Sequence, residues 1–213
     1  MKKKDILFDL DGTLTDPALG ITKSVQYALA HYGIHVADLS SLNCFIGPPL
    51  KGSFMEYYGF SDEQGTEAVE VYREYFSTKG LFENEVYPGI PELLSRLCEQ
   101  GMRLCLATSK PTVFAEQILA HFDLAQYFTF VGGSLLSGER VEKADVLQYV
   151  LAEQKIQKET AVMIGDRRFD IEGARACGIS AIGVLYGYGN REELRQADAI
   201  AETVVDLHRI LEL

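Results

Sequence analysis

Two aspartates that are one residue apart follow the first apolar run of the sequence. The stretch Ile6–Phe8 leads into Asp9, Leu10, Asp11 and then Gly12. Carboxylates this close repel one another, and a buried carboxylate is costly without a partner. Carboxylates also serve as covalent nucleophiles and as general acids or bases. The pair therefore predicts a reactive site whose compensating charges lie elsewhere in the chain.

Further polar residues follow the later apolar runs. If these runs are parallel strands, the residues that follow them meet at one edge of the sheet. The candidates are Thr108, Ser109 and Lys110 after Met102–Thr108, Lys143 beyond Phe128–Val131, and Gly165, Asp166 and Asp170 after Ala161–Ile164. Four carboxylates, a hydroxyl and an ammonium would then share one pocket.

The charge of such a pocket indicates a divalent cation, since its four carboxylates outnumber the ammonium of Lys143. Mg²⁺ favours a site with few carboxylates and a phosphate ligand. Asp-x-Asp-Gly also occurs in calcium loops, but an EF-hand loop starting at Asp9 needs Gly and Glu where this chain has Leu14 and Gly20. We therefore expect Mg²⁺ as the cofactor.

The same residues suit phosphoryl transfer. Asp9 could attack a phosphorus atom, and Asp11 could protonate the leaving group and later deprotonate the water that cleaves the aspartyl phosphate. Nearby carboxylates would raise the pKa of Asp11, which suits an acid that works near neutral pH. Thr108 could donate a hydrogen bond to a phosphoryl oxygen, and Lys143 with Mg²⁺ could neutralise charge on the transferring group.

Several of these residues also have a plain structural explanation. Asp166 and Asp170 are common at helix starts, and Lys143 could be a surface lysine. Ser109 and Lys110 could cap the helix that follows them. The ordered set of residues, rather than any single member, favours a functional site.

Five short apolar runs alternate with helical patterns, and this alternation predicts the fold. The runs are Ile6–Phe8, Met102–Thr108, Phe128–Val131, Ala161–Ile164 and Ser180–Leu185. Such alternation is typical of a parallel sheet covered on both faces. We predict an α/β core, a Rossmann-like doubly wound parallel sheet, in which ligands bind beyond the carboxyl ends of the strands.

The alternation is interrupted between Asp16 and about Glu85, where no strand pattern occurs. Asp16 before Pro17 is typical of a helix start with a capping residue. Ser61 with Gln64 resembles a capping box that opens another long helix. This segment is therefore predicted to be a helical insertion after the first strand.

The insertion defines the expected domains. We expect residues 1–15 and 87–213 to form the catalytic core and residues 16–86 to form a helical cap domain, with hinges near Thr15 and Tyr87. Cap movement would exclude water and complete the site.

A loop rich in glycine and proline, Phe45–Phe54, lies within the insertion. Gly47 and Lys51 in this loop could contact the leaving group of a substrate. The loop could equally be a plain connector between helices.

Composition limits the remaining function classes. The chain has 213 residues and a net charge of −11, which argues against a nucleic-acid partner. No apolar run approaches membrane-spanning length, so we expect no membrane partner and a cytoplasmic protein. The four cysteines have no Cys-x-x-Cys spacing and are expected to be small buried residues of a reducing compartment: Cys44, Cys98, Cys105 and Cys177.

The ordered motifs resemble those of a known family. The sequence DLDGTLTD, a strand that ends in ATSKP, Lys143, and the sequence GDRRFD resemble the four signature motifs of the haloacid dehalogenase (HAD) superfamily. The resemblance covers essentially the whole chain, and the helical insertion matches the small cap of that superfamily. FIGPPL and TSKP are most similar to the phosphoglycolate-phosphatase-like branch.

The resemblance implies a Mg²⁺-dependent phosphatase that acts on a small phosphorylated metabolite. We expect a monomer or weak homodimer, although the sequence does not reveal the oligomeric state. The implied metal ligands are Asp9, Asp166, Asp170 and the main-chain carbonyl of Asp11. The implied roles elsewhere are Asp9 as nucleophile, Asp11 as acid and base, and Thr108 and Lys143 as phosphate binders. Apart from the resemblance, we expect further substrate contacts from Gly12, Ser109, Gly47 and Lys51.

Other functions remain open at this point. A dehalogenase would lack Asp11 and need no metal, so it is disfavoured. A phosphosugar mutase would share the core and cap. Phosphonate cleavage would need a cap lysine, for which Lys51 is the candidate. A phospho-aspartate signalling receiver shares an acidic pocket with Thr and Lys, but its phosphorylated aspartate follows a later strand. The sequence does not identify the phosphomonoester.

Overall fold

The computed structural model describes residues 3–211 of the chain. The chain divides into two compact units, one formed by Met1–Asp16 with Val86–Leu213 and the other by Pro17–Glu85. We call the first the core unit and the second the helical unit.

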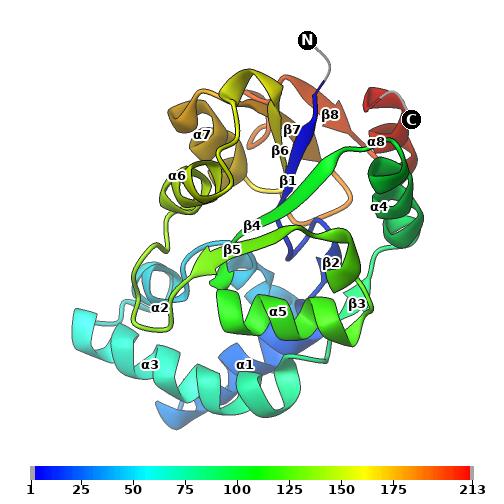
Figure 1. The fold of residues 1–213 in the computed structure, drawn as a ribbon. Helices are drawn as coiled ribbons and strands as arrows, with labels where there is room; N and C mark the ends of the chain where they lie inside the picture. The colour runs from blue at the N-terminus through cyan, green and yellow to red at the C-terminus, as the bar shows by residue number, and fades with distance from the viewer. Residues whose placement is uncertain (1–2, 212–213) are drawn as a thin grey trace. The chain divides into compact units, whose positions relative to one another are not determined.

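The core unit is built on one parallel sheet. Within the described residues the sheet has six strands in the order β5, β4, β1, β6, β7, β8, and every neighbouring pair is parallel (Figure 1). The strands are β1 (Asp5–Phe8), β4 (Arg103–Pro111), β5 (Phe130–Ser134), β6 (Ala161–Gly165), β7 (Ser180–Val184) and β8 (Ala199–Ala201).

The strand order reverses beside β1. The chain places β4 and then β5 on one side of β1 before it crosses to β6, β7 and β8 on the other side. In open α/β sheets, ligands bind outside the carboxyl ends of the strands at such a switch point.

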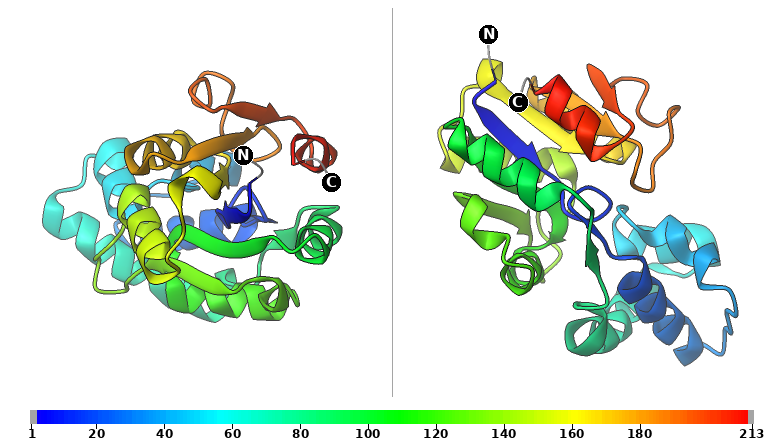
Figure 2. Two further views of the ribbon diagram at one scale, coloured as in Figure 1. Left: turned by 45° about the horizontal axis from the view of Figure 1, so that its top comes forward. Right: turned by 90° about the vertical axis from the view of Figure 1, so that its right-hand side faces the viewer.

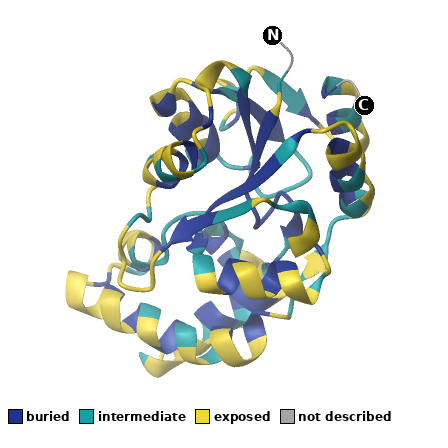
Figure 3. Ribbon diagram, viewed as in Figure 1, coloured by how far each residue is buried: buried dark blue, intermediate teal, exposed yellow. Residues whose placement is uncertain are grey.

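Helices cover both faces of this sheet. α6 (Lys143–Glu153) and α7 (Arg168–Cys177) pack on one face, and α4 (Ile90–Glu99), α5 (Thr112–His121) and α8 (Val204–Ile210) lie on the other (Figures 1 and 2). Every residue of β1 and β6 is buried, because both of their sides face helices. Figure 3 shows these strands in the buried colour and exposed residues on the helices. The predicted doubly wound parallel sheet is confirmed.

The last residue of β1 is in register with residues of both neighbouring strands. Phe8 of β1 pairs with Leu106 of β4 on one side and with Ile164 of β6 on the other. Residues that come directly after these positions therefore share one edge of the sheet.

Some element boundaries differ from the sequence-based expectation. β5 begins at Phe130 rather than Phe128, after a 3-10 turn at Ala125–Tyr127, and β4 continues through Thr108 to Pro111. β8 was not predicted, since a three-residue edge strand has too few residues to form a recognisable apolar run. A second 3-10 turn, Lys158–Thr160, precedes β6.

The helical unit consists of α1 (Ala18–His31), a 3-10 helix at Leu39–Phe45, α2 (Leu50–Tyr58), α3 (Asp62–Tyr75) and a π-helical turn at Phe76–Gly80. The junctions with the core unit are two short strands, β2 (Thr15–Asp16) and β3 (Glu85–Val86).

Helix capping follows the prediction at α3 and departs from it at α1. Ser61 and Gln64 form a reciprocal capping box at the start of α3, as predicted. The N-cap of α1 is Pro17, and no side-chain hydrogen bond caps this helix. The capping role of Asp16 was therefore wrong: its carboxylate accepts a hydrogen bond from the hydroxyl of Tyr188.

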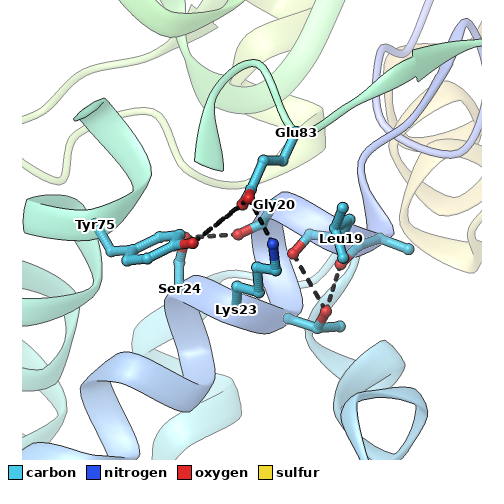
Figure 4. A network of polar contacts seen from close by, with 8 residues as sticks. Leu19, Gly20, Lys23, Ser24, Tyr75 and Glu83 are labelled. Carbon is cyan, nitrogen blue, oxygen red and sulfur yellow. Dashed lines mark hydrogen bonds and ion pairs between the residues drawn. The ribbon is translucent and has the colours of Figure 1, made fainter. Parts of the chain in front are cut away.

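A close approach of α1 to the π-helical turn organises the helical unit. A Cβ on Gly20 would lie 2.0 Å from the carbonyl oxygen of Gly80, so only glycine fits there. Beside it, Lys23 Nζ lies 2.6 Å from Glu83 Oε1, and the Tyr75 hydroxyl donates to Oε2 of the same carboxylate at 3.3 Å (Figure 4).

The cysteines correct one expectation. Cys105 and Cys177 are buried, as expected, but Cys44 is half-buried and Cys98 is exposed. Cys98 lies in the last turn of α4, on a side of that helix that the sheet does not cover.

No helix among residues 3–211 combines the length and the apolar character needed to cross a membrane.

Candidate active site

Asp9 stands directly after β1, at the switch point of the sheet. Its main-chain N–H donates to the carbonyl of Ile164 at 2.9 Å, so the β1–β6 pairing continues one residue beyond the strand. The residue is only 5% exposed. The sheet therefore holds the backbone of Asp9 in place and buries its carboxylate.

Asp166 follows β6, and Asp170 lies in the first turn of α7. Oδ2 of Asp170 accepts a hydrogen bond from the main-chain N–H of Arg167 at 3.0 Å, so this carboxylate caps the helix. Gly165 makes room for it, because a Cβ there would lie 2.1 Å from Asp170 Cγ. Helix capping thus accounts for one oxygen of Asp170, but it does not explain the burial of Asp166.

Asp9, Asp166 and Asp170 form a buried carboxylate triad. One oxygen from each lies within 4.8 Å of the others. Oδ1 of Asp166 is buried and has no hydrogen-bond partner among the residues that the structure describes. Three close carboxylate oxygens, one of them orphaned, fit a divalent cation that prefers oxygen ligands.

Burial raises the pKa of both carboxyl groups that follow β6. For Asp166 burial is the largest cause, the charges of Asp170 and Asp9 add to it, and the N–H of Tyr188 opposes it. Burial also raises the pKa of Asp170, although the Lys143 ammonium lowers it. The ionised carboxylates are therefore destabilised in the protein alone, and a bound cation would stabilise them.

Lys143 is the first residue of α6 and is buried, so the surface-lysine explanation is wrong. Its Nζ lies 2.8 Å from Oδ1 of Asp9 and 2.8 Å from Oδ1 of Asp170, and it donates to the carbonyl of Ala107 at 2.9 Å. The two carboxylate contacts are ion pairs without good hydrogen-bond alignment. Burial lowers the pKa of Lys143, but the two carboxylates outweigh burial and raise it overall, so the ammonium stays charged.

Lys110 belongs to the site, as its place after the apolar run predicted, and the alternative of a plain helix cap is wrong. Its Nζ lies 2.9 Å from Oδ2 of Asp11, and both residues are buried. The N-cap of α5 is Pro111, and no side-chain hydrogen bond caps this helix. The spacing from Thr108 was the available signal, because residues two apart in a strand point to the same side.

Asp11 combines a buried carboxylate with one unused oxygen. Burial is the main cause that raises its pKa, Asp9 adds to the rise, and Lys110 opposes it. Oδ1 of Asp11 is buried and has no hydrogen-bond partner in the described part of the chain. A carboxyl group with a raised pKa can hold a proton closer to neutral pH.

Thr108 and Gly12 also lie at this edge. Thr108 is buried, and its Oγ1 accepts a hydrogen bond from the main-chain N–H of Lys110 at 3.2 Å. Ser109 between them is half-buried. Gly12 has φ +79°, and a Cβ there would lie 2.2 Å from Oδ2 of Asp166. Gly12 is thus required by a close approach to Asp166, and its contact with substrate stays a prediction.

The loop after β7 is a feature of the site that the sequence did not reveal. The main-chain N–H of Tyr188 donates to Oδ2 of Asp166 at 2.7 Å. A Cβ on Gly187 would lie 2.5 Å from that same oxygen, and one on Gly189 would lie 1.8 Å from the carbonyl oxygen of Asp166. The only sequence signal is the pattern Tyr-Gly-Tyr-Gly directly beyond the predicted strand.

The two candidate substrate contacts of the insertion belong to the helical unit. Lys51, in the first turn of α2, lies with its Nζ 2.7 Å from Oδ1 of Asp62. Gly47 has φ +101°, a conformation that favours glycine. Their contact with substrate stays a prediction.

The core unit thus brings four carboxylates and two ammonium groups to the switch point. When all six groups are ionised, four negative charges minus two positive charges leave two negative charges. One divalent cation would balance them. The arrangement offers a nucleophile in Asp9, a proton donor and acceptor in Asp11, and positive charge for an anionic substrate.

Sequence comparison places these residues in a known family. Residues 6–184 match the family described as haloacid dehalogenase-like hydrolase. The chain is 49% identical to a 5'-nucleotidase of Pseudomonas aeruginosa, over 92% of this chain and 88% of the relative. It is 39% identical to tyrosine-protein kinase PtkA of Mycobacterium tuberculosis, over 94% and 67%. It is 31% identical to phosphoglycolate phosphatase 1 of Pseudomonas aeruginosa, over 87% and 70%, in keeping with the predicted branch.

Comparison with solved structures agrees with the family match. A crystal structure described as a predicted phosphatase from Clostridium acetobutylicum superposes with a TM-score of 0.97 at 53% identity, over 100% of both chains. The family match spans the switch-point residues from Asp9 to Asp170. The chain belongs to the haloacid dehalogenase-like hydrolases.

Proposed function

We propose that the protein is a Mg²⁺-dependent phosphatase that hydrolyses a small phosphomonoester through an aspartyl phosphate on Asp9. The observation that carries this proposal is the buried triad of Asp9, Asp166 and Asp170 at the switch point, with the Lys143 ammonium 2.8 Å from two of its members. The geometry suits nucleophilic attack by one carboxylate beside a cation held by all three.

The reaction has two steps. In the first, an oxygen of Asp9 forms a bond to phosphorus, the ester P–O bond breaks, and Asp11 gives its proton to the leaving oxygen. In the second, Asp11 takes a proton from a water whose oxygen attacks phosphorus, and the bond to Asp9 breaks. Inorganic phosphate leaves, and both aspartates return to their starting state.

The metal would be held by Asp9, Asp166, Asp170 and the main-chain carbonyl of Asp11. A Mg²⁺ ion held there would supply positive charge to neutralise the oxygens of the phosphoryl group. Lys143 adds a second charge on the same group, and Thr108 donates a hydrogen bond to it.

Substrate choice is the part of the proposal that the core does not decide, because every phosphomonoester presents the same phosphoryl group. A nucleoside monophosphate and phosphoglycolate are the first candidates, since relatives carry the names 5'-nucleotidase and phosphoglycolate phosphatase. We propose that the helical unit acts as a cap and sets this choice, with Gly47 and Lys51 as contacts. Gly12–Thr15 and Glu85–Gly89 are proposed as its hinges.

A panel of phosphomonoesters tests the proposal. Phosphate release is measured with Mg²⁺ and with EDTA for the wild type and for Asp9→Asn. Mg²⁺-dependent release that is lost in the variant supports the phosphatase, and the best ester names the substrate class. Full metal-dependent activity in Asp9→Asn would overturn the assignment of Asp9 as the nucleophile, because an amide cannot take that role.

Two further assays follow if no ester is cleaved. Interconversion of sugar phosphates would indicate a phosphosugar mutase on the same core. Transfer from ATP to a tyrosine peptide would indicate the activity for which the relative PtkA is named. Either result, without ester hydrolysis, would overturn the phosphatase proposal.

A further inference from the structure

The loop Tyr186–Gly189 after β7 wraps around Asp166. The main-chain N–H of Tyr188 donates to Oδ2 of Asp166 at 2.7 Å. Gly187 and Gly189 approach Asp166 so closely that a Cβ on either would overlap it. The fold therefore uses this loop to hold one oxygen of Asp166, and the other oxygen, Oδ1, is left without a hydrogen-bond partner among residues 3–211.

The same loop is tied to the strand that leads into the helical insertion. The hydroxyl of Tyr188 donates a hydrogen bond to Oδ1 of Asp16, the last residue of the core unit before the insertion. The hydroxyl of Tyr186 donates to the carbonyl of Thr13 at 3.0 Å. Its ring also packs edge-to-face on Tyr87, with ring centroids 5.1 Å apart. The loop thus contacts the chain on both sides of the insertion.

The main-chain amide and the side chain of Tyr188 bind two different carboxylates. Its amide holds a carboxylate of the triad, and its side chain holds the carboxylate at the junction. Burial raises the pKa of Tyr188, and the hydrogen bond to Asp16 adds to the rise, so the hydroxyl keeps its proton and remains a donor. Tyr188 therefore connects the carboxylate of Asp166 to the carboxylate of Asp16, at the start of the insertion, through two hydrogen bonds.

We propose that Tyr188 is a positioning residue for the metal site: its bond to Asp16 fixes the loop, and the fixed loop aims Oδ1 of Asp166 at the cation. This inference rests on the proposed Mg²⁺ site. Groups that orient metal ligands typically change metal affinity by about 10- to 100-fold when they are removed.

The test is Mg²⁺ binding measured by titration calorimetry, with thermal unfolding of the same proteins with and without Mg²⁺. Tyr188→Phe keeps the amide and the ring and removes only the hydroxyl. We expect its Mg²⁺ affinity to fall about tenfold. Asp16→Ala should lose affinity equally, and the double variant should lose no more than either single variant, because both remove the same bond.

Conservative variants separate positioning from a merely structural role. Asp16→Asn keeps an oxygen acceptor for the Tyr188 hydroxyl and should retain most of the Mg²⁺ affinity. Tyr75→Phe removes a similar hydroxyl–carboxylate bond, to Glu83 in the helical unit, and should leave Mg²⁺ affinity unchanged. If Tyr188→Phe is unstable, the Asp16→Ala and Asp16→Asn pair alone carries the test.

The outcomes distinguish this inference from the proposed function. Wild-type affinity in both Tyr188→Phe and Asp16→Ala would overturn the positioning role and leave the phosphatase proposal intact. A lower unfolding temperature at unchanged Mg²⁺ affinity would overturn it too, because the bond would then serve only stability. Absence of Mg²⁺ binding by the wild type would overturn both.

Discussion

The ammonium of Lys110 lies 2.9 Å from Oδ2 of Asp11, and both side chains are buried. The proposed acid and base of the reaction is therefore not an isolated carboxyl group. Burial raises the pKa of Asp11, and the charge of Lys110 lowers it, so the overall rise is smaller than burial alone would cause.

Replacement of Lys110 by methionine should move the pH profile. The ammonium lowers the pKa of Asp11, so its removal lets that pKa rise further. Asp11 gives its proton when the ester bond breaks, so it must be protonated in the free enzyme. We therefore expect the alkaline limb of kcat/KM against pH to move to higher pH in Lys110→Met.

The matched control for this variant is Lys158→Met, which removes an exposed lysine. Its profile should overlay that of the wild type. An unshifted alkaline limb in Lys110→Met would show that Lys110 does not tune the acid.

Asp166→Asn should make the stability of the metal-free protein less dependent on pH. Because the pKa of Asp166 is raised in the folded protein, the folded state binds more protons than the unfolded state above the ordinary carboxyl range. The free energy of unfolding of the metal-free wild type should therefore fall as pH rises through that window. The variant lacks this carboxylate, so its stability should depend less on pH.

Mg²⁺ should raise the free energy of unfolding of the wild type, because a bound cation stabilises the buried carboxylates. At a concentration of 100 Kd, a ligand specific for the folded state adds about 2.7 kcal/mol. Asp166→Asn should gain only a small part of this in urea unfolding with Mg²⁺ against EDTA. Asp145→Asn, which changes an exposed carboxylate on α6, should behave as the wild type. Full Mg²⁺ stabilisation of Asp166→Asn would contradict the triad as the metal site.

Gly187→Ala should damage both folding and metal binding. Its Cβ would lie 2.2 Å from the carbonyl oxygen of Gly12 and 2.5 Å from Oδ2 of Asp166, so the loop or the carboxylate must move. Overpacking of this kind costs about 1–3 kcal/mol. We expect a lower unfolding temperature and weaker Mg²⁺ binding.

Gly52→Ala provides the comparison, because a Cβ on this α2 glycine meets nothing within 4 Å. Alanine favours the helix there by up to about 1 kcal/mol, so stability should be equal or higher. If Gly187→Ala matched it in stability and Mg²⁺ affinity, the close packing around Asp166 would have no energetic role.

Local patterns explain why much of the fold and the triad could be predicted from sequence. Asp9 comes directly after a short apolar run and Asp166 one residue after another, and parallel strands bring such positions together. Lys143 lies further beyond its strand, at the start of α6, where the macrodipole makes a cation unusual, and the loop after β5 leads to it. These positions depend only on strand order and direction.

Long-range side-chain contacts explain what the sequence did not reveal. The sequence placed Lys110 at the site but not its ion pair with Asp11, and it gave no sign of the bond between Tyr188 and Asp166, because no local pattern encodes either pair. Asp16 has the sequence context of a helix cap, but a tyrosine distant in sequence donates to its carboxylate. Tertiary packing overrides local preference at such positions.

The most direct test of the account is to trap the covalent intermediate. The enzyme is mixed with Mg²⁺ and its best phosphomonoester, quenched in acid during turnover, and digested for mass spectrometry. The account predicts one phosphoryl group on the peptide that holds Asp9, more of it in Asp11→Asn, and none in Asp9→Asn. Turnover with no phosphoryl group at Asp9 in either the wild type or Asp11→Asn would contradict it.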